Sequence, residues 1–131
     1  MQKTIIIHGL EGRPGDNLNE EIQWLGNSLG LFGKRDKEKS CFRVFLELIK
    51  NKNGLTSDEI AHSSNLSRAT VIHHLDKLME SSLIIYRKNK YILRCRNMED
   101  LIDDIEKDIK RMFKDVREVS KKIDSELKMR Q

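Results

Sequence analysis

The sequence is poor in the residues that build large cores, covalent cross-links and sharp turns. Aromatic residues make up 5% of the 131 residues, hydrophobic residues make up 37%, and there is a single proline. The two cysteines, Cys41 and Cys95, lie far apart and form no CxxC pair, so neither a disulfide framework nor a zinc ribbon is indicated. No apolar run reaches the length of a membrane span and no signal peptide is recognisable, so we expect a cytoplasmic protein without a membrane partner.

Charged residues, in contrast, are abundant at 35% of the chain, and they are unevenly distributed. Residues 34–96 hold 14 Lys and Arg against seven Asp and Glu, a net charge of +7, whereas residues 1–33 and 97–131 are slightly acidic. A basic middle suits a polyanionic partner, because each phosphate that is neutralised releases condensed counterions. A solvated surface would have the same composition, so charge alone does not decide between the two.

Residues 1–35 predict an extension ahead of the basic region. A β-branched run at 3–7 predicts a strand, and Asn17 begins a predicted helix with apolar residues along one face. The glycines that follow predict a hinge over residues 26–35.

The basic region begins with three predicted helices. Apolar residues at three- and four-residue spacing predict a helix over 36–51. The run TSDE at 56–59 is a capping box that begins a second, short helix. Ser67 is the expected N-cap of the third helix, 67–80, whose inward residues are Val71, Leu75 and Leu78.

A hairpin is predicted after the third helix. The β-rich segments LIIY and YIL flank the polar quartet at 87–90, Arg87, Lys88, Asn89 and Lys90. This pattern predicts two strands with a basic tip, although the turn lacks the Asn-Gly pair that is typical of such hairpins.

The order of helix, short capped helix, turn, helix and basic hairpin is the winged helix arrangement. The run GLTSDEIAHSSNLSRATVIHHLDKLMESSLIIYRKNKYIL resembles the DNA-binding region of ArsR and MarR type regulators of bacteria and archaea. The matching pieces are Leu55-Thr56, Glu59-Ile60-Ala61, Leu66-Ser67, Thr70-Val71, His74-Leu75, Leu78 and Leu83-Ile84, while Ser82 stands where the family usually has glycine. The resemblance covers a little under half of the chain. It implies a mainly α-helical fold with a small β-wing, a winged helix-turn-helix domain over 36–95, and double-stranded DNA as the partner.

The third helix is the expected recognition helix. An α-helix fits the major groove of B-DNA, and side chains near its N-terminus reach the base edges. Arg68 is the best candidate for a guanine contact, because its fork can pair with two acceptors. The expected DNA contacts are Ser67 (also the cap), Arg68, Thr70, His73 and Lys77 on the helix, and Arg87, Lys88 and Lys90 on the wing, with Lys34, Arg35, Lys37 and Lys39 as further candidates for phosphate contacts.

The paired histidines are expected to differ in role. His73 is expected to face DNA, whereas the resemblance places His74 at a packing or hydrogen-bonding position. Adjacent residues lie about 100° apart on a helix, so the two rings do not readily share one metal ion. The cysteine-bearing metal motif of the ArsR type is absent. We therefore expect no metal site, no cofactor, and passive thiols at Cys41 and Cys95.

Residues 96–131 predict one long helix that begins at the cap Asn97. Its apolar residues alternate spacings of four and three, the a/d seam of a coiled coil: Ile105, Ile109, Met112, Val116, Val119 and Ile123. The small domain over 36–95, called the head below, cannot cover a seam of this length, so we expect a homodimer formed through this helix. The alternative, in which the helix folds back onto residues 17–32 of its own chain, stays open.

Two other functional classes are alternatives to DNA binding. The run IIIHGLEG at 5–12 resembles the strand and His-Gly loop of α/β-hydrolases, but no G-x-S-x-G elbow follows and the chain is too short for that sheet, so we expect no enzyme. A winged-helix protein-interaction module of the transcription machinery is the stronger alternative, in which Trp24 and Leu31-Phe32 could contact a partner or the long helix. The polar outward face of the helix 67–80 favours DNA, so we predict a sequence-specific DNA-binding transcription regulator.

Overall fold

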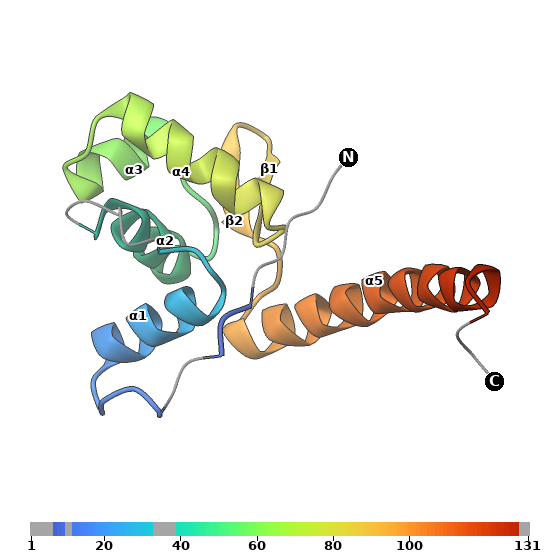
Figure 1. Ribbon diagram of the computed structural model, residues 1–131. Coiled ribbons are helices and arrows are strands. Elements are labelled where there is room, and N and C mark those ends of the chain that lie inside the picture. Colours follow the sequence, from blue (N-terminus) through green and yellow to red (C-terminus); the bar gives the residue numbers. More distant parts are fainter. Residues whose placement is uncertain (1–6, 10–11, 33–38, 129–131) are drawn as a thin grey trace. The chain divides into compact units, whose positions relative to one another are not determined.

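The computed structural model describes residues 7–9, 12–32 and 39–128. The chain divides into two units, Met1–Arg96 and Asn97–Gln131, which are described separately. The first unit holds four helices and a β-hairpin, and the second holds one long helix (Figure 1). The expected strand at 3–7, apart from its last residue, lies outside the described residues, as do Lys34, Arg35 and Lys37.

Helix α1 (Leu18–Ser28) begins where Asn17 predicted it, with the Asn17 side chain accepting from the amide of Glu20 at 2.8 Å. The helix runs through Gly26, so the hinge expected over 26–35 does not start there. The helix ends at Ser28, and the turn after it contains Gly30, whose φ of 67° suits glycine and lets the amide of Leu31 reach the carbonyl of Gly26 at 2.9 Å.

The two residues after this turn belong to the core of the first unit. Leu31 and Phe32 are both buried, and the Phe32 ring packs edge-on against Phe42 and Phe45 at centroid distances of 5.6 and 6.3 Å. The partner contact considered for Leu31-Phe32 is therefore wrong, because these side chains tie the N-terminal segment to the head.

Helix α2 (Ser40–Lys50) is the centre of the head, where it packs against α1, α3 and α4. Helix α3 (Ser57–Ser64) begins at the predicted capping box, and both of its hydrogen bonds between Thr56 and Glu59 are present, at 2.9 and 3.1 Å. Hydrogen bonding to the backbone amide and then the side chain of Thr56 lowers the pKa of the Glu59 carboxyl, so acidification would weaken the box.

Helix α4 (Arg68–Glu80) confirms the predicted third helix, including its cap at Ser67 and its fully buried face of Val71, Leu75 and Leu78. Its C-terminal end is closed by two hydrogen bonds, from the Ser82 amide to Met79 O and from the Leu83 amide to Leu78 O. This pattern requires a left-handed residue at Ser82, which has φ 62°. Serine thus adopts the conformation for which the resembling family uses glycine.

The predicted hairpin consists of β1 (Ile84–Arg87) and β2 (Lys90–Leu93), antiparallel and in the register Arg87 opposite Lys90. Lys88 and Asn89 form a two-residue turn and both have positive φ, as a type I′ turn demands. A single bridge between Leu55 and Tyr91 joins the loop before α3 to the hairpin. The first unit therefore has the complete winged helix order.

The second unit is α5 (Met98–Glu126), capped by Asn97, which accepts from the amide of Asp100 at 2.8 Å. Several apolar side chains of α5 are exposed: Phe113, Val116, Val119, Ile123 and Leu127. None of the helices in the described part of the chain has the length and apolar character needed to cross a membrane.

Candidate nucleic-acid interface

The N-terminal end of α4 carries the residues expected to touch DNA. The Ser67 hydroxyl accepts from the amide of Thr70 at 3.2 Å and donates to Thr70 Oγ1 at 2.8 Å, so the cap orients both side chains. Arg68 follows with its side chain 72% exposed, and its Nε lies 3.5 Å from Oδ1 of Asp58 on α3. Because an ion pair this exposed contributes about 0–1 kcal/mol, the guanidinium can leave Asp58 for another acceptor at little cost.

The two histidines of α4 separate as expected. His73 is exposed, whereas Nε2 of His74 lies 2.7 Å from Oγ of the buried Ser40 at the start of α2. This contact joins the first helix of the basic region to the recognition helix, so the hydrogen-bonding role expected of His74 is confirmed. No cluster of three metal-ligating side chains occurs among the residues that the structure describes.

Lys77 has an internal contact that the sequence did not predict. Its side chain is half-buried, and Nζ donates to the carbonyl of Leu31 at 2.7 Å. The amine therefore fastens the end of the N-terminal segment to α4, and it lies on one flank of the helix rather than at the centre of the outward face.

Two acidic residues occupy the outward face of α4 and were missed in the sequence. At about 100° per residue, Asp76 and Glu80 fall on the same face as Ala69 and His73, and both are exposed. The spacing of 69, 73, 76 and 80 is the helical period that identifies this face. Since these carboxylates repel phosphate, the surface of α4 that suits DNA is confined to its first two turns.

The wing tip presents the expected cations. Arg87, Lys88 and Lys90 are all exposed, and the two-residue turn holds them close together. Alternation along the strands places Arg87 and Lys90 on the face of the hairpin that also carries Ile85 and Ile92.

The other face of the hairpin carries two tyrosines that were not predicted as site residues. The rings of Tyr86 and Tyr91 lie 4.8 Å apart, and the Tyr86 hydroxyl donates to Oδ1 of Asn89 at 2.9 Å. Burial raises the pKa of Tyr91, with Tyr86 and Asp76 adding to the effect and Arg68 opposing it. Tyr91 therefore lies within electrostatic range of both charges on α4. The sequence carries a signal for this pair, because the two tyrosines occupy directly opposite positions of the hairpin.

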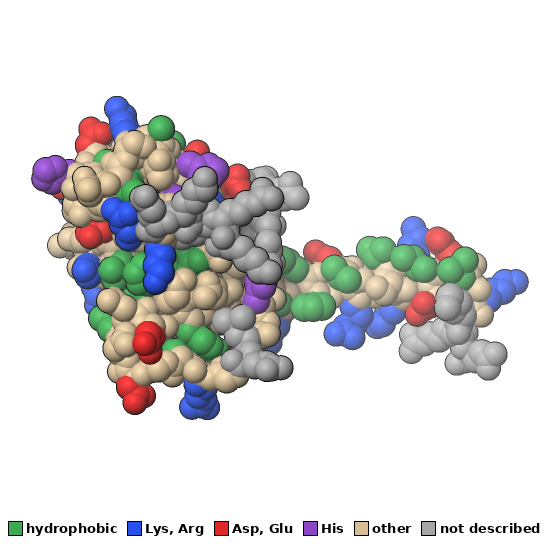
Figure 2. All heavy atoms as spheres, turned by 60° about the vertical axis from the view of Figure 1, so that its left-hand side comes forward, with side chains coloured by type: hydrophobic (Ala, Val, Ile, Leu, Met, Phe, Trp, Pro, Cys, Tyr) green, Lys and Arg blue, Asp and Glu red, His purple; other side chains and the backbone are tan. Residues whose placement is uncertain are grey.

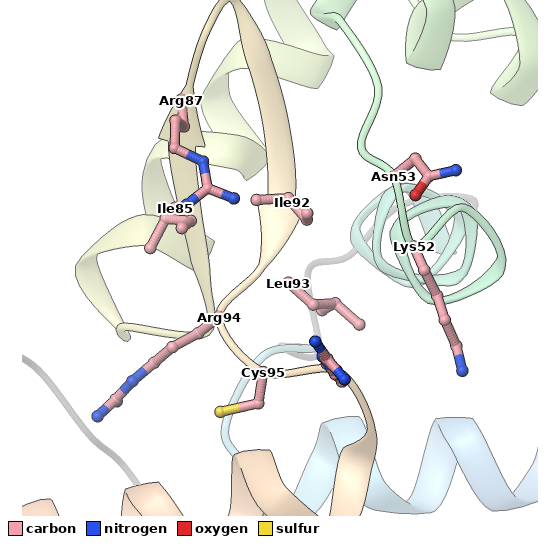
Figure 3. A pocket seen from close by; sticks show the side chains of 9 residues that line it. Lys52, Asn53, Ile85, Arg87, Ile92, Leu93, Arg94 and Cys95 are labelled. Atoms are coloured by element: carbon pink, nitrogen blue, oxygen red, sulfur yellow. The ribbon is translucent and has the colours of Figure 1, made fainter.

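A shallow cavity of about 440 Å³ lies on the Ile85–Ile92 face of the wing (Figure 3). Its charged lining residues are all cationic: Lys52, Arg87, Arg94 and Arg96. A second hollow of about 310 Å³ nearby is lined by Asn53, Arg87, Lys88, Lys90 and Ile92. The Ile85–Ile92 side of the wing therefore carries cations beyond those of its tip, and it continues the surface that a phosphate backbone could follow.

Comparison with known protein families agrees with this geometry. Residues 46–85 match the model of a family described as winged helix-turn-helix DNA-binding. The matched segment runs from α2 through α3 and α4 into β1. The described residues of this segment therefore have the winged helix-turn-helix fold, and they are similar to a family described as DNA-binding.

The family match does not test the resemblance to ArsR and MarR type regulators. The family description names neither the ArsR nor the MarR type. No curated protein matches the chain.

Proposed function

We propose that this protein is a sequence-specific, double-stranded DNA-binding transcription regulator that acts as a dimer. The observation that carries the proposal is the exposed first turn of α4, where a fixed cap presents Arg68 beside a cationic wing. A helix N-terminus with exposed polar side chains is the part of a recognition helix that enters the major groove.

Base recognition is assigned to Arg68, with His73 and Thr70 beside it. Arg68 can pair with O6 and N7 of guanine, a contact that discriminates against other bases by about 1–3 kcal/mol. Its pairing with the exposed Asp58 supports this role, since the arginine is oriented before DNA arrives but is not locked in place. Lys77 is left out of the proposed contacts because its amine binds Leu31 O.

The wing is assigned to the phosphate backbone or the minor groove. Arg87, Lys88 and Lys90 supply charge at the tip, where such contacts position a protein on DNA without reading sequence. Ser67 keeps its role as cap and adds a hydroxyl near the same backbone.

Dimerisation is assigned to the a/d seam of α5. Two heads related by a two-fold axis would present their α4 helices to successive major grooves, about 34 Å apart, so the expected binding site is pseudo-palindromic.

The proposal is tested by selecting binding sites from fragmented genomic DNA at physiological salt. The wild type should enrich a small set of fragments that share a pseudo-palindrome. Arg68→Ala should relax the preference at one base position of each half-site, at a cost of about 1–3 kcal/mol. Lys88→Ala should weaken binding to every sequence equally and lower the salt slope by about one.

The contrast between the two variants is the control. If Arg68→Ala lost the same affinity on every sequence, Arg68 would be a phosphate contact and not a base contact. If the wild type bound no DNA, or bound all fragments weakly and the variants did not differ from it, the protein-interaction module would become the better assignment.

A further inference from the structure

We propose that α5 carries a second DNA-binding surface, a stripe of cations that contacts the phosphate backbone. The stripe consists of Lys107, Lys110, Lys114, Arg117 and Lys121, and we call it the basic stripe. This inference rests on the proposed function, because it takes double-stranded DNA as the partner.

The helical period gathers these five residues on one side of α5. At about 100° per residue, they fall within a sector of about 80°, which holds no other residue between Lys107 and Lys121. The sector therefore contains no carboxylate over this length, although three Asp and Glu lie elsewhere on the same stretch of helix. At 1.5 Å per residue, the stripe extends for about 21 Å along the helix axis.

The cations of the stripe differ from Arg111 and Lys122, two other cations of α5, in the carboxylates that lie near them. Arg111 pairs with the buried Asp108, and Lys122 lies 3.9 Å from Glu126. Within the part of the chain that the structure describes, Lys114, Arg117 and Lys121 have no carboxylate within 4.0 Å, and Lys110 has a single exposed partner, Glu106, at 3.7 Å. The middle of the stripe therefore holds charge that the helix itself does not neutralise.

The same residues line a hollow on the helix surface. Lys110, Lys114, Arg117 and Lys121 surround a groove of about 440 Å³, together with Phe113 and Glu118. In Figure 2, a group of Lys and Arg side chains lies along the lower edge of α5, while hydrophobic side chains run along its upper edge.

The position of the stripe relative to the seam favours DNA over a membrane surface. The seam residues centre about 155° around the helix from the stripe, so the two surfaces lie almost back to back. A helix that lies in a bilayer interface uses cations beside its apolar face, where they reach lipid headgroups. Cations opposite the apolar face would point away from the bilayer, but they would stay accessible to DNA when a second helix covers the seam.

The test removes two stripe cations and compares them with two matched cations outside the stripe. Lys114→Gln/Arg117→Gln and Arg111→Gln/Lys122→Gln each remove one Lys and one Arg from the same helix. Binding of the full-length protein to double-stranded DNA is measured by fluorescence anisotropy from 50 to 300 mM salt. Circular dichroism and sedimentation velocity check that both variants keep the helix content and oligomeric state of the wild type.

Loss of two phosphate contacts should lower the salt slope by about two and weaken binding about tenfold on every DNA sequence, and only in the stripe variant. Equal changes in both variants, with sequence-selective binding intact, would overturn the stripe and leave the proposed function standing. Absence of DNA binding by the wild type would overturn both. Binding of phosphatidylserine vesicles that is lost in the stripe variant, with DNA binding unchanged, would reassign the stripe to a membrane.

Discussion

Gly26 lies in the last turn of α1 although glycine is a poor helix former. A Cβ atom built at this position would come within 1.8 Å of the Phe32 ring, and two further ring atoms would lie within 2.5 Å. The missing side chain is therefore the space that Phe32 fills. This contact has no local sequence signal, since the glycine and the phenylalanine are separated by a turn and only the folded chain brings them together.

Gly26→Ala is expected to destabilise the protein by about 1–3 kcal/mol, because the ring must move from its place between Phe42 and Phe45. This would reverse the usual ranking, in which alanine stabilises a helix by about 1 kcal/mol relative to glycine. Urea unfolding followed by circular dichroism measures the difference.

A double-mutant cycle separates crowding from helix propensity. In a Phe32→Ala background the ring is gone, so Gly26→Ala should become neutral or stabilising. A penalty that persists in that background would show that something other than Phe32 disfavours the methyl group.

At the scale of elements, the helix starts that carry a side-chain cap were predicted correctly, whereas α2, which was predicted to start at 36, begins at Ser40 without such a cap. The caps at Asn17, Thr56, Ser67 and Asn97 are all in place, because each acts on an amide three residues ahead and leaves a local signature. The turn of the wing had no such signature, since Lys88-Asn89 adopts the conformation for which Asn-Gly is usual. The register of the strands and the burial of the hydrophobic face enforce a turn that the two residues do not favour themselves.

The junction between α4 and the wing also contains a residue in a backbone conformation that it does not favour. Ser82 has φ 62°, a conformation that costs a residue with a side chain about 1 kcal/mol. Ser82→Gly should therefore stabilise the protein by about 0.5–1 kcal/mol in urea unfolding, less the extra freedom that glycine gives the unfolded chain. Ser82→Ala is the control, because it removes the hydroxyl and keeps the Cβ. A gain of equal size in both variants would mean that the hydroxyl, and not the backbone conformation, is responsible.

The outward face of α4 shows where periodicity alone was incomplete. The sequence predicted the inward residues correctly, because three buried apolar side chains repeat with the helical period. The DNA contacts predicted on the outward face omitted Asp76 and Glu80. They included Lys77, whose amine binds Leu31 O. The residues on the outward face of a helix follow from their angular positions, and their chemistry is a separate property.

At the scale of the whole molecule, α5 combines an apolar seam with the basic stripe on its other side. Val116 and Val119 are 59% and 57% exposed, and Ile123 is 48% exposed, in a helix that is otherwise highly charged. Apolar residues that repeat with alternating spacings of four and three are buried in coiled coils by a partner helix. Ile105, by contrast, is already buried in the single chain, so the outer half of the seam is the part open to a partner.

Val116→Glu is therefore expected to convert the proposed dimer into a monomer. Each dimer would bury two carboxylates in the seam, and at about 2–4 kcal/mol of lost association free energy the dissociation constant rises by about 30- to 1,000-fold. Sedimentation velocity at micromolar concentration measures the change, and Lys114→Glu is the control, since it places the same side chain on the opposite side of the helix. The monomer should keep the base preference of a half-site while losing the preference for a palindrome, because base reading belongs to α4 and spacing belongs to the dimer. A wild type that sediments as a monomer, or a Val116→Glu variant that stays dimeric, would move the dimer contact away from this seam, and the fold-back of α5 onto its own chain would then be the better explanation for its apolar face.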